Sequence, residues 1–382
     1  MPLTRTFLGN LMPTTTASMA GMGGRDSLTV HRNADPGGPP ELLSQYQEIL
    51  RETRLSWSER HRMIQRLGSG GQGVVYLSER IGADQFTLRV ALKIFSPEGY
   101  ADAPAYDAAM ARMAQVAVRV ALIQQDNLID VHNLIELNGV RLLEMEWVDG
   151  FDLQRLLSTG MLLRARQHVS AERWEYLNNV IVTAGAIQPR LKPGVAIAVL
   201  RDCLAALSAL HREGIVHGDL KPSNIMLKRT GNAKLIDIGS AYEWVHGSRV
   251  RTCTPAYSAP EVMEGDGGSP QADLASLGYV LVEMLAGAPP FARITTEAAL
   301  LEAKKTILDR LATTLPDEVV CNELLMNLIG GLIAPNPADR FPSAEAADLV
   351  EQGAASFHRQ LVRGNLASEY ENEIRVWLQE LD

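Results

Sequence analysis

Four short segments of the sequence contain residues whose types suit phosphate and metal chemistry. One is rich in glycine, and missing side chains let backbone N–H groups approach phosphate oxygens closely. The others carry a lysine on an apolar strand and carboxylate or amide side chains of the kind that bind Mg²⁺ as hard oxygen ligands. The four segments are Gly68–Val75, Val90–Lys93, His217–Asn224 and Leu235–Gly239.

Taken alone, each segment has a plain structural interpretation. A hairpin turn that needs positive φ angles would explain the glycines, and a solvated strand face would explain Lys93. A dinucleotide-binding fold would require the glycines to open a helix, whereas the β-branched and aromatic residues from Val74 to Leu77 favour a strand, which argues against NAD. The joint order and spacing of the four segments make a chance combination very improbable.

The elements that must position these segments change along the chain from strands to helices. Strand-like composition occupies residues 62–95, and a helical stretch follows at 105–124. Two further strands are predicted at 128–137 and 140–147, and the remainder is mostly helical. Strands first and helices second predict a two-lobed α+β body.

The ends and one internal segment stand apart from this body. Residues 1–40 are rich in Thr, Gly and Pro and are predicted to be a disordered tail, because they cannot bury enough apolar surface to offset the entropy of ordering. A lead-in helix is predicted over 41–61, an insertion at about 158–193 and a C-terminal helical tail over 351–382. The apolar stripe of the tail favours docking onto its own helical lobe, and a partner bound by the tail or the insertion is the alternative.

Composition excludes several classes of function. The net charge of −9 provides no basic footprint for nucleic acid. No run reaches the roughly 18–20 uninterrupted apolar residues of a membrane span, so none is expected. Cys203, Cys253 and Cys321 show neither paired zinc spacing nor an even count for disulfides, which favours a reducing, cytoplasmic setting.

Together the segments resemble the Ser/Thr branch of the protein kinase family over residues 62–350. The motifs occur in the family's order: the Gly-rich loop, V-A-L-K, H-G-D-L-K-P-S-N, D-I-G and A-P-E, followed by a matching Arg340. The resemblance implies the two-lobed protein kinase fold, with a small, mostly β N-lobe over 62–145 and a larger helical C-lobe over 149–350. It also implies ATP and Mg²⁺ as cofactors and a protein as substrate.

The resemblance assigns roles in phosphoryl transfer to five polar residues. Lys93 would hold the α and β phosphates, and Asn224 and Asp237 would bind Mg²⁺. Asp219 would orient the substrate hydroxyl and accept its proton. Lys221 would approach the transferring phosphate, and a lysine here is typical of Ser/Thr kinases.

It also assigns the walls of the nucleotide site. The loop glycines would cover the phosphates, the hinge backbone would pair with adenine beside a gatekeeper at Met145, and apolar residues would sandwich the ring. These residues are Gly68, Gly70 and Gly73 for the loop, Glu146 and Val148 for the hinge, and Val75, Ala91 and Met226 for the ring. An ion pair between Glu261 and Arg340 would anchor the activation segment, and Asp273 would brace the catalytic loop.

The sequence departs from the family pattern on the predicted helix after Lys93. Relatives carry a glutamate there that pairs with the lysine, but no Glu occurs between residues 98 and 136, and the position falls at about Val116. Lys93 would lack an anionic partner unless Asp107 or a phosphate oxygen substitutes. The alternative to an active enzyme is therefore a nucleotide-binding pseudokinase or scaffold. A small-molecule kinase is disfavoured, because A-P-E and Arg340 build a platform for protein substrates.

Two further departures concern the activation segment. Gly218 replaces an arginine that clamps a phosphorylated loop in many relatives, so the loop between Asp237 and Glu261 is expected to order without a phosphate. Ile238 replaces the aromatic residue of D-F-G and can fill the same apolar gap.

Overall fold

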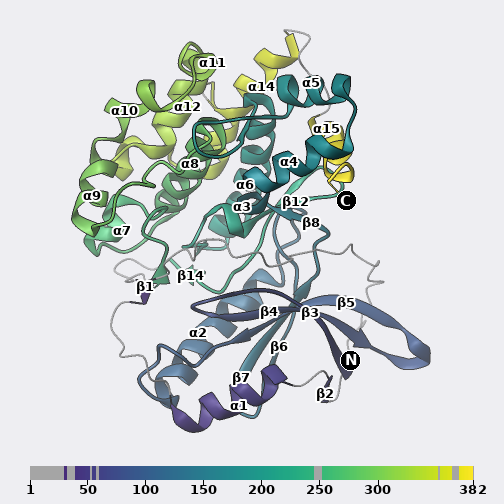
Figure 1. Cartoon of the computed structure of the whole chain (residues 1–382). Coiled ribbons are helices and arrows are strands. Elements are labelled where there is room, and N and C mark those ends of the chain that lie inside the picture. The colour runs from purple at the N-terminus through teal and green to yellow at the C-terminus, as the bar shows by residue number, and fades with distance from the viewer. Residues whose placement is uncertain are drawn as a thin grey trace, which may run out of the picture.

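The chain folds into two lobes in the computed structural model (Figure 1). The structure describes residues 30–31, 39–51, 54–56, 60–244, 252–351, 353–363 and 370–381. A β-sheet with two helices forms one lobe, and helices dominate the other. This confirms the predicted α+β, two-lobed fold. The predicted disordered tail lies outside the described residues, apart from 30–31 and 39–40.

The N-lobe is built on one antiparallel sheet with the strand order β2-β3-β4-β5-β7-β6. Strands consecutive in the sequence pair from β2 to β5 and again between β6 and β7, whereas β5 pairs with β7 instead of β6. The glycine-rich turn joins β3 to β4. The strands are β2 (Arg54–Ser56), β3 (Arg60–Gly70), β4 (Gly73–Ile81), β5 (Thr87–Phe95), β6 (Val131–Leu137) and β7 (Val140–Glu146).

Strand β5 is apolar almost throughout because both faces of the sheet are covered. Leu92 packs in a cluster with α1 (Pro40–Arg51) on one face. Ala91 belongs to the cluster on the other face, which includes α2 (Ala103–Val120). Alternate residues of a strand point to opposite faces, so Lys93 shares the face of Ala91 and points toward the C-lobe.

The lead-in helix is shorter than predicted. Helix α1 begins with Pro40 at a position where no backbone N–H is needed, and it ends at Arg51. Residues 54–56 form β2 and pair with the start of β3, so the prediction of helix up to residue 61 is wrong. Ladder hydrogen bonds at the sheet edge satisfy the backbone groups that a longer helix would have paired internally.

The C-lobe is organised around two buried helices, α6 (Pro193–Arg212) and α8 (Pro270–Ala286). Helix α12 (Glu323–Ile333) packs closely on α8 at Gly278, where an added Cβ would overlap the Ile333 side chain. Shorter helices complete the lobe: α3 (Leu153–Leu156), α7 (Pro260–Glu264), α9 (Glu297–Lys305), α10 (Ile307–Thr314), α11 (Asp317–Val320), α13 (Ala344–Leu349) and α14 (Ala354–Arg363).

Helix α6 is the one helix in the described part of the chain that is long and apolar enough to cross a membrane. It packs instead in the middle of the C-lobe, where 67% of its most apolar stretch is buried against other helices. Its length and composition therefore match those of a central core helix.

The insertion and the C-terminal tail lie side by side on the C-lobe. The insertion forms α4 (Thr159–His168), α5 (Ala171–Val180) and a small hairpin of β9 (Val182–Thr183) and β10 (Arg190–Leu191). The tail ends in α15 (Tyr370–Gln379), which buries Trp377. Arg173 of α5 binds Glu380 at 2.7 Å, so an ion pair joins the two segments.

One three-stranded sheet and two strand pairs hold the loops that lie between the lobes. Strands β8 (Gly150–Asp152), β12 (Ile225–Lys228) and β13 (Ala233–Leu235) form one sheet, and β11 (Ile215–Val216) pairs with β14 (Tyr242–Glu243). A further pair joins β1 (Val30–His31) to β15 (Thr252–Cys253). The loops that follow β11 and β13 carry the polar residues singled out by the sequence.

Candidate functional site

A cleft of about 580 Å³ lies between the lobes. All of the residues that the sequence proposes for catalysis, cofactor binding and metal binding line it, so the fold brings the separate motifs together at one place. They are Gly68, Gly70, Gly73, Val75, Ala91, Lys93, Glu146, Val148, Asp219, Lys221, Asn224, Met226 and Asp237.

One end of the cleft is apolar. Val75 and Ala91 of the N-lobe sheet and Met226 of β12 line it, close to the segment that joins the lobes. Apolar walls contributed by both lobes suit a flat aromatic ring, with polar groups at the edge to fix its orientation.

Glu146 lies in the joining segment, but its side chain has a structural partner. It forms a buried ion pair with Lys234 of β13, and Oε1 also accepts a hydrogen bond from the Asp130 amide at 2.8 Å. A buried carboxylate paired in this way is held in place. The Glu146 amide also donates to the Asp130 carbonyl at 2.9 Å. The hinge contact that the sequence hypothesis requires would therefore use the Glu146 carbonyl oxygen.

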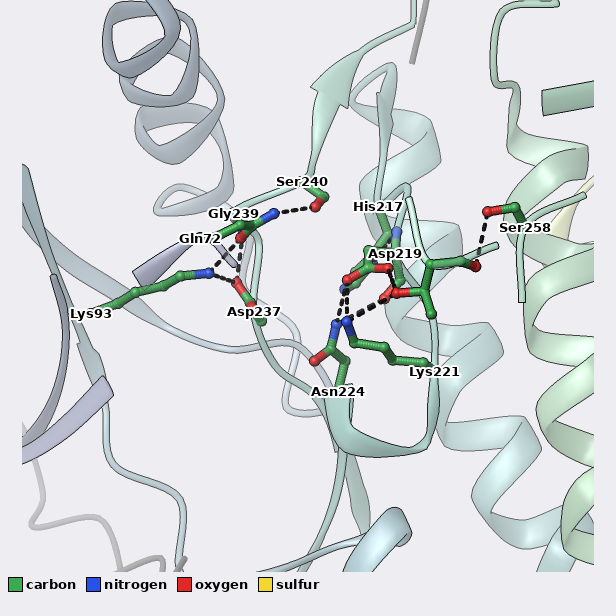
Figure 2. Close-up of polar contacts among 11 residues, drawn as sticks. Gln72, Lys93, His217, Asp219, Lys221, Asn224, Asp237, Gly239, Ser240 and Ser258 are labelled. Carbon is green, nitrogen blue, oxygen red and sulfur yellow. Dashed lines mark hydrogen bonds and ion pairs between the residues drawn. The ribbon is translucent and has the colours of Figure 1, made fainter. Parts of the chain in front are cut away.

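The other end of the cleft is polar and centres on Lys93 (Figure 2). The lysine is only 3% exposed. Its Nζ lies 2.5 Å from Asp237 Oδ1 and 2.7 Å from Gln72 Oε1. The ammonium therefore has one charged and one neutral acceptor.

Asp237 lies two residues after the end of β13 and has a left-handed backbone, with φ of 67°. Its Oδ1 also accepts a hydrogen bond from the Gly239 amide at 2.9 Å. Burial alone would raise the pKa of Asp237, but the ammonium of Lys93 and this hydrogen bond favour the charged form and lower the pKa to about 2. Asp237 is thus an ionised oxygen donor at neutral pH, which suits a metal ligand.

Asp219 and Asn224 occupy the loop between β11 and β12. Asp219 binds Lys221 at 2.7 Å and accepts a hydrogen bond from the Thr254 hydroxyl at 2.6 Å. Asn224 donates to the backbone oxygen of Asp219 at 2.8 Å, and its own backbone oxygen accepts from the Ile236 amide. The last contact places Asn224 beside the segment that carries Asp237.

The donor set fits Mg²⁺ bound together with a nucleotide. In the described part of the chain, no cluster of three or more His, Cys, Asp or Glu side chains could hold a metal by itself. Asn224 and Asp237 provide two hard oxygen donors, and Mg²⁺ commonly completes such a site with phosphate oxygens and water.

Asp273 of α8 holds the start of the loop between β11 and β12. Its carboxylate accepts hydrogen bonds from the amides of His217 and Gly218 at 2.8 and 3.0 Å, and it lies 2.9 Å from His211 Nε2. Gly218 has φ of 77°, and an added Cβ would lie 2.9 Å from the Tyr242 ring. Both the backbone conformation and the space thus favour glycine at this position.

Two buried cations hold the activation segment. Arg340 binds Glu261 through two hydrogen bonds of 2.7 and 2.8 Å. Lys304 of α9 is completely buried and donates to the backbone oxygens of Ala256 and Ser258 at 2.9 and 2.8 Å. Residues 245–251 lie outside the described part of the segment.

The helix position that lacks glutamate presents an apolar side chain. Val116 of α2 is buried, with 3% exposure, in the cluster between α2 and the sheet. Asp107, the other candidate partner for Lys93, is exposed and pairs with Arg141 at 3.0 Å instead. The partners of Lys93 thus come from the glycine-rich loop and from Asp237.

Sequence reasoning did not single out two residues that contact the site or the activation segment, Gln72 and Lys304. Gln72 was visible only as a polar residue among glycines. Lys304 carried no signal, because a lysine on an amphipathic helix is normally solvated.

Comparison with known proteins agrees with this geometry. Residues 61–350 match the model of the protein kinase domain. The chain is 31% identical over 289 residues to the serine/threonine-protein kinase PknD of Mycobacterium tuberculosis, covering 74% of this chain and 38% of that protein. It is 30% identical over 310 residues to Pkn1 of Myxococcus xanthus, covering 78% and 38%. A probable serine/threonine-protein kinase PknB of Lactococcus lactis is 27% identical, covering 62% of this chain and 33% of the relative. The chain thus spans less than two fifths of the length of these relatives.

Proposed function

Because the chain belongs to the protein kinase family, we propose that it transfers the γ-phosphoryl group of ATP to Ser or Thr hydroxyls of protein substrates. The single observation that carries this proposal is the convergence of Lys93, Asp219, Asn224 and Asp237 on one cleft. Phosphoryl transfer needs positioned charges of this kind and little covalent work from the protein.

Each polar residue has a task that its surroundings support. Asn224 and Asp237 would hold Mg²⁺, which neutralises phosphate charge when bound. Lys93 would direct its ammonium at the phosphates. Asp219 would accept the proton of the substrate hydroxyl, and Lys221, 2.7 Å from it, would place positive charge near the transferring group.

We also propose where the enzyme acts. The acidic net charge disfavours nucleic acid as a substrate, the A-P-E segment with Arg340 supports a protein substrate, and the three cysteines without paired spacing support a cytoplasmic setting. Partner docking through the insertion or the C-terminal helix would have to use surfaces outside the contact between α5 and α15.

No finding favours the pseudokinase alternative. That interpretation rested on the missing glutamate of α2, and Lys93 has two other acceptors in the structure. The relatives with matching kinase domains are also named as serine/threonine-protein kinases.

The test measures transfer of labelled phosphate from ATP to a general Ser/Thr substrate in the presence of Mg²⁺. Asp219→Asn keeps the size of the side chain but removes the base, so we expect a loss of about 10² to 10⁴ in rate. Asp309→Asn is the matched control, because Asp309 is exposed on α10 and far from the cleft. Equal transfer by wild type and Asp219→Asn would contradict the proposal.

A further inference from the structure

Gln72 lies at the tip of the glycine-rich turn, and its backbone position is fixed. Its carbonyl oxygen accepts a hydrogen bond from the Ser96 amide at 2.9 Å, which continues the pairing of β4 with β5. The residue is therefore anchored to the sheet next to Lys93, and its side chain enters the cleft.

The Gln72 amide connects the two lobes (Figure 2). Its Oε1 accepts from Lys93 Nζ at 2.7 Å, and its Nε2 donates to Ser240 Oγ at 2.5 Å. Ser240 lies three residues after Asp237, at the start of the activation segment. Gly239 leaves room for this contact, because an added Cβ would lie 2.5 Å from Lys93 Nζ and closer still to Gln72 Oε1.

An ammonium group carries three hydrogens and no acceptor. Asp237 and Gln72 accept two of them, and the first of these acceptors is also a candidate metal ligand. Helix α2 offers no carboxylate close by, because Val116 is apolar and Asp107 is paired with Arg141. Among the described residues, Gln72 is thus the one hydrogen-bond acceptor of Lys93 that does not also serve the metal.

We propose that Gln72 is a positioning residue that holds Lys93 for the nucleotide phosphates in place of the α2 glutamate, with Ser240 fixing its amide. A neutral amide oxygen orients the ammonium without neutralising it. Asp237 is then the one charged acceptor of Lys93 among the described residues, so the glutamine adds no second counter-charge that would compete with a triphosphate. This inference rests on the proposed nucleotide site, and it does not require that phosphate is transferred.

The experiment measures binding of Mg–ADP by calorimetry and, separately, kcat and KM for ATP. Gln72→Leu removes the acceptor at similar volume, and we expect Mg–ADP binding to weaken about tenfold. Ser240→Ala releases the amide and should weaken binding in the same direction by a smaller factor. Gln65→Leu is the matched control, because Gln65 is exposed on β3 outside the cleft and should bind as wild type.

Gln72→Leu could also weaken binding by altering the glycine-rich turn itself. Repeating the substitution in a Lys93→Met background separates this effect from one that acts through Lys93. If Gln72 acts through Lys93, adding Gln72→Leu to the Lys93→Met variant should change Mg–ADP binding by less than twofold. The inference would be overturned if Gln72→Leu binds Mg–ADP within twofold of wild type. It would also be overturned if Gln72→Leu weakens binding as much in the Lys93→Met background as in wild type.

The same data distinguish this inference from the proposed function. Wild type that binds Mg–ADP but transfers no phosphate would contradict the proposed function, while the binding cycle would still decide the role of Gln72. Wild type that binds no nucleotide would overturn both.

Discussion

Thr254 donates its hydroxyl hydrogen to Asp219 Oδ1 over 2.6 Å, which ties the activation segment to the candidate base. Lys221 Nζ contacts the same hydroxyl at 3.1 Å. The Thr254 hydroxyl therefore contacts both the carboxylate and the ammonium that we propose act on the substrate. A hydrogen bond to a charged partner contributes about 1.5–3 kcal/mol, enough to affect the rate if the geometry is lost.

We predict that Thr254→Ala lowers kcat by about tenfold or more, because Asp219 loses the donor that orients it. Thr254→Ser keeps the hydroxyl and should retain kcat within about threefold. Steady-state kinetics with a peptide substrate give both values. Equal kcat for Thr254→Ala and wild type would show that Lys221 and Asn224, which contact the other carboxylate oxygen, are enough to position it.

We predict that Lys304→Met raises KM for a protein substrate more than KM for ATP. Lys304 Nζ lies 4.1 Å from the ring centre of Tyr279 and donates to two backbone oxygens of the activation segment. Methionine has a similar length but leaves both oxygens unpaired, at a cost of about 1–3 kcal/mol each. KM for a protein substrate should rise at least fivefold, and KM for ATP should change much less.

Lys305→Met is the control for this prediction. Lys305 is the next residue on α9, but it is exposed and pairs with Glu264 on the surface. The same substitution there should leave both KM values near those of wild type. A similar rise of substrate KM in the two variants would indicate a general effect of lost charge on α9.

We predict that Arg340→Leu lowers the free energy of unfolding by about 3–5 kcal/mol, because it leaves Glu261 buried without its partner. Chemical denaturation measures the change. Arg62→Leu is the matched control, since the Arg62 side chain is 50% exposed in its pair with Glu79, and surface pairs contribute less than about 1 kcal/mol. Similar losses of unfolding free energy in the two variants would show that burial does not decide how much these ion pairs contribute.

We predict an acid-dependent contribution from Glu144 of β7. Its buried carboxylate binds His61 at 2.7 Å and Arg80 at 2.6 Å, with His132 at 3.4 Å. Burial raises the pKa of Glu144, but the hydrogen bonds from the two histidines and the charge of Arg80 lower it to about 2. A carboxyl group with a lowered pKa contributes stability above its unfolded pKa of 4.5, and this contribution is lost as the pH falls toward 2.

The measurement is urea denaturation of wild type and Glu144→Gln from pH 5 downward. Wild type should be more stable at pH 5, and the difference should shrink at lower pH by up to about 3 kcal/mol. A difference that stays constant over this range would show that Glu144 stabilises the sheet through packing alone.

The residues that line the cleft could be predicted because their chemistry restricts their types and each motif is short. Lys93, Asp219, Asn224 and Asp237 lie in loops or strands whose local sequence also marks the element. Local chemistry is thus enough to locate these features.

Other features depend on contacts between distant segments. Lys304 is buried because carbonyl groups of residues 256 and 258 turn toward it, and no local pattern records that. The end of α1 at Arg51 depends on a three-residue strand, which is too short to show a period. Gln72 is a neutral residue at a glycine-rich turn, and its partner on β5 is 21 positions away.

The contact between Lys93 and Asp237 also bears on the order in which ligands enter. The Lys93 ammonium contacts the carboxylate oxygen of Asp237 that a divalent ion would need, so free magnesium must compete with a built-in cation. A nucleotide changes this balance, because its phosphates give the ammonium a new counter-charge as the carboxylate is released. Magnesium and nucleotide should therefore arrive as one complex, and the metal alone should bind weakly.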